Sequence, residues 1–483
     1  MRENSIVKSP DNNYLLSRST KMIMYLPDKL NDCINLGFEN TGNNTEVDTY
    51  YLEKIKFLKK NGILSGQEYS VNINEDILSS EAIQHSFLTT NQIVFEVTDK
   101  CNLNCTYCCY GDLFGDHFKQ EIGDMSYGKA KSFLKYFFSK RLQLDRYAQS
   151  KELYIGFYGG EPLMNFTLVK KIVSFIKSFD LPFEVIFSMT TNGTLLKKYY
   201  KYLVENDFYL NVSIDGFYKN NEYRCYKNQR NCHPEIIDGL KTLNLFSPKY
   251  YKAKVVLHSV LHNLNSVDEI SKFAKSLNLR YTISSINHDG IQPDQVDRFN
   301  EMFKTVSSEF VNTSNELINE NYFDIPEVRK FNTLLRKHSG IFYDSYKDLF
   351  VLDKKSEQNY ITGTCIPFSR KVFITVEGNI LPCERISQIN QLGTIKGDSV
   401  HIDFNEVSNK YLNWFRKAAI ICLRCRRIDS CKGCLFQSFD DEKSYCRNFE
   451  KQDKDVTILE PSFAFVEKNR DLLYKLIYEL IIV

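Results

Sequence analysis

The sequence lacks any long apolar run of the kind that spans a membrane. Its first residues, Met-Arg-Glu-Asn-Ser, also lack the apolar stretch of a secretory signal peptide. The formal net charge is only +2, which gives no strong field toward nucleic acid or acidic membranes. These absences predict a cytoplasmic protein that binds neither nucleic acid nor a membrane.

Cysteine, in contrast, is abundant, with 14 residues in the 483 of the chain. In a secreted protein this number would suggest disulfides, but in a reducing cytoplasm clustered cysteines indicate a metal. Ten of the 14 fall into two groups with ligand-like spacing. The remaining four are predicted to be small buried or half-buried residues without a ligand role: Cys33, Cys109, Cys225 and Cys232.

The first group is Cys101, Cys105 and Cys108, and it follows an apolar run over 92–97 that predicts a buried strand. Three thiolates on one loop can hold three irons of a four-iron cluster and leave the fourth iron open to a small molecule. A structural zinc site would need four ligands, and no fourth cysteine or histidine is in register here. Cys109 is adjacent to Cys108, so its side chain is expected to point elsewhere.

This loop, with the aromatic Tyr107 before its third cysteine, resembles the cluster loop of the radical S-adenosylmethionine (SAM) enzymes. The resemblance implies a [4Fe-4S] cluster on the three cysteines, with SAM at the open iron. It also implies an open, partial barrel of parallel strands rather than a closed eight-fold one.

The pattern between residues 89 and 300 agrees with that fold, because six strand patterns alternate with helical ones. We therefore predict an α/β protein with a partial (β/α)6 TIM-like barrel. The expected strands are 93–97, 153–158, 184–189, 209–214, 254–260 and 280–286, and the expected helices are 127–139, 168–178, 195–205, 234–243 and 267–277.

Functional residues of such a barrel lie in the loops that follow the strands. The resemblance assigns SAM binding to three of these loops. The Gly159-Gly160-Glu161-Pro162 loop would contact the SAM amino group, and Thr190 and Asn192 would lie near the ribose. Ser213 and Arg224 would meet the ribose hydroxyls and the SAM carboxylate, for which the arginine fork is well shaped.

Three polar residues near these loops have less certain roles. Asp215 is either a functional residue or only part of an Asp-Gly turn. His258 and His262 lie at the end of the fifth strand pattern and are expected to be surface or core residues rather than ligands.

The second group comprises seven cysteines within residues 361–447, too many for one structural zinc ribbon. Their order resembles the SPASM extension of radical SAM enzymes, which implies two auxiliary iron–sulfur clusters. By analogy the outer cluster would use Cys422, Cys425, Cys431 and Cys446, and the inner one Cys365, Cys383 and Cys434. Two residues separate Cys431 from Cys434 where the extension usually has three, and no eighth cysteine completes the inner set.

Glu384 follows Cys383 directly. In some sulfatase-maturing relatives an acidic residue at this place removes a substrate proton, so Glu384 is a tentative general base. The alternative is a carboxylate at the surface or beside the cluster ligands.

The ends of the chain carry no metal motif. Residues 1–88 show a hairpin pattern over 13–26 and a helical pattern over 50–60, which suit a winged-helix-like module that holds a leader peptide, or a plain extension packed on the barrel. A helical bridge is expected over 301–360 and a C-terminal helix within 448–483.

Together these features predict a radical SAM/SPASM maturase. It would cleave SAM reductively, using flavodoxin or ferredoxin, and abstract hydrogen from a ribosomally made precursor peptide to install a thioether or carbon–carbon crosslink. A sulfatase-type protein maturase is the alternative within the class. A non-catalytic iron–sulfur electron carrier is the alternative outside it, and that protein would have no need of the Gly-Gly-Glu-Pro loop. The sequence does not show which substrate residues are modified.

Overall fold

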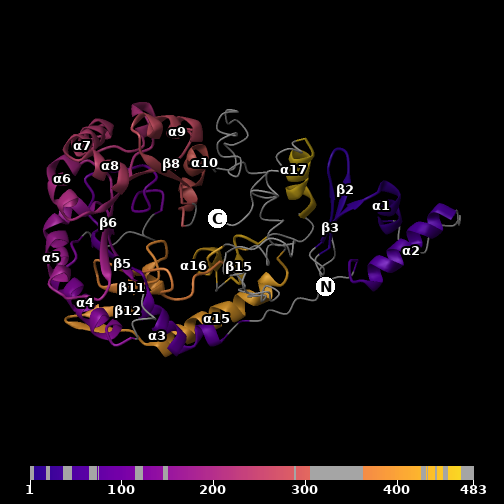
Figure 1. Cartoon of the computed structure of the whole chain (residues 1–483), viewed down its shortest axis with the longest axis horizontal. Coiled ribbons are helices and arrows are strands. Elements are labelled where there is room, and N and C mark those ends of the chain that lie inside the picture. The colour runs from indigo at the N-terminus through magenta and orange to yellow at the C-terminus, as the bar shows by residue number, and fades with distance from the viewer. Residues whose placement is uncertain are drawn as a thin grey trace.

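The computed structural model describes most of the chain (Figure 1). The described residues are 5–17, 22–35, 46–64, 73, 75–114, 123–144, 151–287, 290–304, 363–425, 431, 433–440, 443–449 and 455–468. Within these ranges no helix combines the length and the apolar character that crossing a bilayer requires. The expected bridge over 301–360 lies almost wholly outside the described residues.

Six parallel strands in chain order form the curved centre of the molecule, which confirms the partial barrel. They are β4 (Gln92–Thr98), β5 (Glu152–Gly159), β6 (Glu184–Thr191), β7 (Tyr209–Ser213), β8 (Val255–Leu261) and β9 (Arg280–Ser285). The helices that follow them lie outside the strands (Figure 1). They are α4 (Tyr127–Arg141), α5 (Phe166–Lys177), α6 (Leu196–Glu205), α7 (His233–Phe246), α8 (Pro248–Lys254) and α9 (Val267–Ser276).

Local chemistry explains where these helices begin. The Ser126 side chain accepts a hydrogen bond from Lys129 N at the start of α4, and Ser266 does the same for Glu269 N at α9. Their apolar faces cover the sheet, so Phe133 of α4 meets the fully buried Phe95 of β4 with ring centroids 6.1 Å apart. The short helix α8 was absent from the predictions because it follows α7 after a single residue.

The cysteine-rich part of the chain continues the barrel sheet rather than forming a detached unit. β10 (Val372–Ile374) pairs in parallel with β4, and the antiparallel strands β11 (Asn379–Leu381), β12 (Gly393–Lys396) and β13 (Ser399–His401) extend the sheet to ten strands. The helix α15 (Phe404–Cys422) then packs on α3 (Ser80–Thr89), and α16 (Leu435–Ser438), β14 (Phe439–Asp440) and β15 (Tyr445–Cys446) follow. This pairing brings the second cysteine group to the strand that precedes the first.

The N-terminal residues form an antiparallel sheet of β1 (Ser5–Lys8), β2 (Asn13–Ser17) and β3 (Met22–Leu26), followed by α1 (Asp28–Asn35) and α2 (Glu46–Lys60). They have a small core of their own, which includes Leu15, Leu26 and Ile55. The helix α17 (Asp455–Lys468) lies against β1 (Figure 1). Its Glu467 accepts hydrogen bonds of 2.6 to 2.7 Å from Ser9, Asn12 and Tyr14. The remaining helix near the barrel is α10 (Val296–Met302).

Candidate functional site

The loop after β4 carries Cys101, Cys105 and Cys108 at the mouth of the barrel. Neighbouring backbone fixes it, since Asn104 N donates to Cys225 O over 2.8 Å and Thr106 N donates to Tyr223 O over 3.0 Å. The three thiols lie within electrostatic reach of one another. Burial raises the pKa of Cys101 to about 11 and that of Cys105 well above its usual range. Such thiols ionise when a bound metal supplies positive charge, so this loop fits an iron–sulfur cluster.

A four-iron cluster and a single metal ion place different demands on their ligands. In the part of the chain that the structure describes, no three His, Cys, Asp or Glu side chains stand close enough to hold one metal ion. A mononuclear site needs every ligand at about 2.0–2.3 Å from the same metal. In a four-iron cluster each thiolate binds a different iron, so wider spacing is what a cluster requires.

The Gly-Gly-Glu-Pro turn lies directly against the cluster loop. A Cβ on Gly159, whose φ is +128°, would lie 1.9 Å from the carbonyl oxygen of Thr98, and one on Gly160 would lie 2.4 Å from that of Lys100. The two glycines are therefore needed for the close approach of the two loops. Pro162 is buried and opens the short helix η4 (Pro162–Asn165).

Glu161 is fully buried and lies within electrostatic reach of Cys101. Its carboxylate accepts hydrogen bonds from Leu163 N at 3.0 Å, Thr191 Oγ1 at 2.7 Å and Asn192 N at 2.6 Å. Burial raises the pKa of Glu161 to about 7, against these three donors. The side chain thus ties the loop after β5 to the loop after β6.

The other residues predicted to meet SAM lie on the same edge of the sheet. Asn192 places its amide nitrogen 3.7 Å from Cys101 Sγ and 2.8 Å from Asn102 Oδ1. Thr190 is half-buried near the end of β6, and Ser213 is buried at the end of β7. The structure therefore brings Asn192 to the cysteine loop and places Thr190 and Ser213 near the ends of neighbouring strands, and their roles toward SAM remain predictions.

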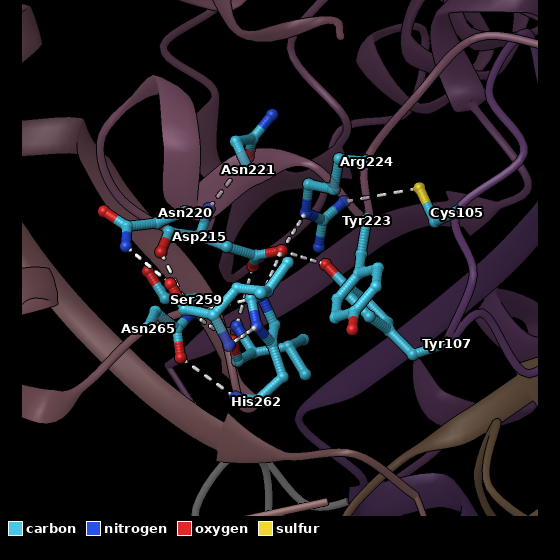
Figure 2. A network of polar contacts seen from close by, with 12 residues as sticks. Cys105, Tyr107, Asp215, Asn220, Asn221, Tyr223, Arg224, Ser259, His262 and Asn265 are labelled. Carbon is cyan, nitrogen blue, oxygen red and sulfur yellow. Dashed lines mark hydrogen bonds and ion pairs between the residues drawn. The ribbon is translucent and has the colours of Figure 1, made fainter. Parts of the chain in front are cut away.

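A buried polar network surrounds Asp215, next to the cluster loop (Figure 2). Its carboxylate accepts hydrogen bonds from Arg224 Nε at 3.2 Å, from Val260 N at 2.9 Å and from the Tyr107 hydroxyl. His262 Nε2 lies 3.5 Å away. Burial opposes ionisation of Asp215, but Arg224, His262 and Tyr107 together outweigh burial and lower the pKa of Asp215 to about 2. Asp215 is therefore more than a turn residue.

Arg224 connects this network to the cluster loop, because its Nη1 lies 4.0 Å from Cys105 Sγ (Figure 2). One edge of its guanidinium is occupied by Asp215, and Nη1 faces the loop. His262 is fully buried, as a core histidine, while His258 is half-buried and bonded to Thr282 Oγ1 at 2.9 Å. Sequence reasoning missed the network because its members follow three different strands.

Glu96 is a second buried carboxyl that sequence reasoning missed. It accepts hydrogen bonds from the Tyr110 hydroxyl at 2.8 Å and from Val376 N at 3.0 Å. It therefore joins the segment after Cys108 to the hairpin of the second cysteine group. Burial raises the pKa of Glu96 to about 7. The sequence signal that could have revealed Glu96 is its position as a single charged residue within the apolar run of β4.

The four cysteines assigned to the outer cluster line one small cavity. Burial, together with the neighbouring thiols of Cys431, Cys446 and Cys425, raises the pKa of the Cys422 thiol to about 12. Four thiols around one cavity fit a second iron–sulfur cluster.

The three cysteines assigned to the inner cluster also lie together. The Cys434 thiol lies within electrostatic reach of Cys365, and that of Cys383 within reach of Cys434. A hydrogen bond of 2.8 Å from Leu435 N to Thr364 Oγ1 joins the two distant segments. Burial raises the pKa of Cys383 to about 11, so this set too needs a metal to ionise.

Glu384 forms an ion pair with Lys371, whose Nζ lies 3.1 Å from one carboxylate oxygen and 3.3 Å from the other. The half-buried Tyr158 lies within electrostatic reach of both Glu384 and Cys108, so Glu384 is on the side of the barrel mouth. Its role as a base remains a prediction.

Comparison with known proteins identifies the superfamily of this site. Residues 95–277 match the family model described as Radical SAM superfamily. The chain is 23% identical to a cysteine-type anaerobic sulfatase-maturating enzyme of Clostridium novyi, over 78% of this chain and 95% of that protein. It is also 23% identical to the radical SAM cyclopropyl synthase TigE of Paramaledivibacter caminithermalis, over 81% of this chain and 84% of that protein.

The fold likewise matches a solved structure, native anSMEcpe with bound AdoMet and Cp18Cys peptide. The TM-score is 0.50 at 19% identity, over 80% of this chain and 98% of that one. The cysteine loop, the matched domain and the auxiliary cysteines agree on a SAM-binding [4Fe-4S] cluster with auxiliary iron–sulfur clusters. We conclude that residues 95–277 form a radical SAM domain and that the protein is an enzyme.

Proposed function

We propose that the protein is a radical SAM/SPASM maturase that modifies a ribosomally made peptide in the cytoplasm. The observation that carries the proposal is the contact between the two parts of the chain that hold the cysteine groups. β10 pairs with β4, and Glu96 accepts hydrogen bonds from both Tyr110 and Val376. A substrate at the barrel mouth would then lie between the SAM-binding loop and the auxiliary cysteines.

When bound, the first cluster and SAM supply a 5′-deoxyadenosyl radical, after one electron has arrived from a flavodoxin or ferredoxin. The residues of the chain would bind the cluster and SAM and enclose them. Cys101, Cys105 and Cys108 would hold three irons, and Glu161 holds together the two loops that would bind SAM. The buried Asp215–Arg224 pair keeps a cationic nitrogen at the cluster loop without exposing it to water.

The N-terminal sheet supports a substrate that is recognised through a leader. In the described residues β3 pairs with β2 on one side only, while α17 covers β1 on the opposite edge. An open edge can accept an extended peptide as a further strand. Tyr25, which is 57% exposed on β3, would offer it an apolar contact. We infer that the leader binds along β3 and that the modified segment reaches the barrel mouth.

The product would be a thioether or carbon–carbon crosslink within the peptide. Glu384 is our candidate for the base that removes the substrate proton. The alternative, maturation of a sulfatase residue, is favoured by the similarity to the Clostridium novyi enzyme and by the peptide bound in the anSMEcpe structure.

Co-expression with a short peptide encoded beside this chain tests the proposal. We expect the intact mass of that peptide to fall by about 2 Da per crosslink, since two hydrogens leave for each bond formed. The same peptide without its leader should be modified far more slowly. Modification of a sulfatase active-site cysteine peptide, with no change in the neighbouring peptide, would favour the alternative.

A further inference from the structure

Tyr411 is a buried residue of α15 whose hydroxyl has no hydrogen-bond partner in the described part of the chain. Only 1% of this residue is exposed to solvent. Leaving a buried hydroxyl unpaired is costly, and phenylalanine would fill nearly the same space without that cost. The hydroxyl therefore points to a partner that belongs to the loaded protein.

Three thiols lie within electrostatic reach of this hydroxyl. Cys434, Cys383 and Cys365 all lie close enough to act on the charge of the Tyr411 hydroxyl. They are the three cysteines assigned to the inner auxiliary cluster. Apolar rings pack on the Tyr411 ring, whose centroid lies 5.2 Å from that of Phe436 and 6.4 Å from that of Phe415.

We propose that Tyr411 donates a hydrogen bond to a sulfur of the inner auxiliary cluster. It acts as a positioning residue and sets the reduction potential of that cluster. Tyr411 is expected to donate a hydrogen bond rather than bind iron. Iron binding would need its phenolate form, and a phenolate there would face three thiolates in an apolar pocket. The inference rests on the assignment of Cys365, Cys383 and Cys434 to one cluster and is independent of the peptide that is modified.

A donor to a cluster sulfur stabilises the reduced state, which carries more negative charge. Removing it should shift the potential of the inner cluster to a more negative value and leave the other two clusters unchanged. An electron from the substrate side would then enter the inner cluster less readily.

The test compares Tyr411→Phe with wild type in the anaerobically reconstituted full chain. Tyr250→Phe is the matched control, because it also removes one buried phenol hydroxyl, here bonded to Phe208 O at 2.5 Å. We expect unchanged iron content in both variants. In redox titrations followed by electron paramagnetic resonance, we expect a negative potential shift in the inner cluster of Tyr411→Phe alone. That variant should also lose an exchangeable proton coupling.

Three outcomes would overturn the proposal. An unchanged potential would give Tyr411 a purely structural role, and loss of about four irons would make it a ligand. Cys365→Ala identifies the inner-cluster signal and tests the assignment separately. If that variant kept all the wild-type iron, the inner cluster itself would be wrongly placed and the proposal would fail with it.

Discussion

Replacing Asp215 with asparagine tests the buried network beside the cluster loop. Asp215 and Arg224 are exposed by only 0% and 8% of their side chains, so the change leaves a guanidinium buried without its counter-charge. Removing one partner of a buried ion pair typically costs about 3–5 kcal/mol. The drop in the pKa of Asp215 from 3.8 to about 2 corresponds to roughly 2–3 kcal/mol. We therefore expect Asp215→Asn to lower the free energy of unfolding by about 3 kcal/mol.

Chemical denaturation followed by circular dichroism measures this loss, and Asp238→Asn is its matched control. Asp238 pairs with Lys197 at 2.8 Å, but the two side chains are 54% and 64% exposed. Breaking such a pair should cost less than about 1 kcal/mol. The double variant Asp215→Asn with Arg224→Met should recover part of the loss, since no buried charge then remains unpaired.

The pH dependence gives an independent check. Because folding lowers the pKa of Asp215, its stabilisation is complete above its ordinary pKa of 3.8 and is lost as the pH falls through about 2. The asparagine variant should lack this part of the acid sensitivity. A loss for Asp215→Asn within about 0.5 kcal/mol of that for Asp238→Asn would refute the reasoning.

Three further predictions concern other parts of the site. Gly160→Ala should displace the cluster loop and remove about four irons per chain, measured by iron analysis, whereas Gly128→Ala in α4 should be neutral, because a Cβ there meets nothing nearer than 3.9 Å. Burial raises the pKa of Glu96 from 4.5 to about 7, so the wild type should lose stability as the pH rises from 4.5 to 7. At pH 8 the free energy of unfolding of Glu96→Gln, measured by denaturation, should exceed that of the wild type by up to about 3 kcal/mol. An equal dependence of stability on pH in the two proteins would contradict this. Glu384→Gln should abolish peptide modification while SAM cleavage persists, and Lys371→Met should leave modification intact. Mass spectrometry of the peptide measures both results. Full peptide modification by Glu384→Gln would show that Glu384 is not the base.

The barrel could be predicted from sequence because its signals are local. Apolar runs bounded by helical patterns placed all six strands to within a few residues, as for β6, expected over 184–189 and found over Glu184–Thr191. The cysteine loop was equally local, since its spacing and its place after a strand are both read within about twenty residues.

What could not be predicted depends on contacts between distant segments. The pairing of β10 with β4 joins residues about 280 positions apart, and no local pattern specifies it. The Asp-Gly sequence at Asp215 is an ordinary turn signal, and only the fold brings Tyr107 and Arg224 to its carboxylate. The unpartnered hydroxyl of Tyr411 is likewise invisible in a helical pattern.

The most direct test of the account is SAM cleavage by the reconstituted protein and by a variant with Cys101, Cys105 and Cys108 all replaced by alanine. The wild type should hold about twelve irons and convert SAM to 5′-deoxyadenosine under reduction, and the variant should keep about eight irons and form none. Undiminished iron in the variant, or 5′-deoxyadenosine formed without these three thiols, would contradict the claim that they hold the SAM-binding cluster.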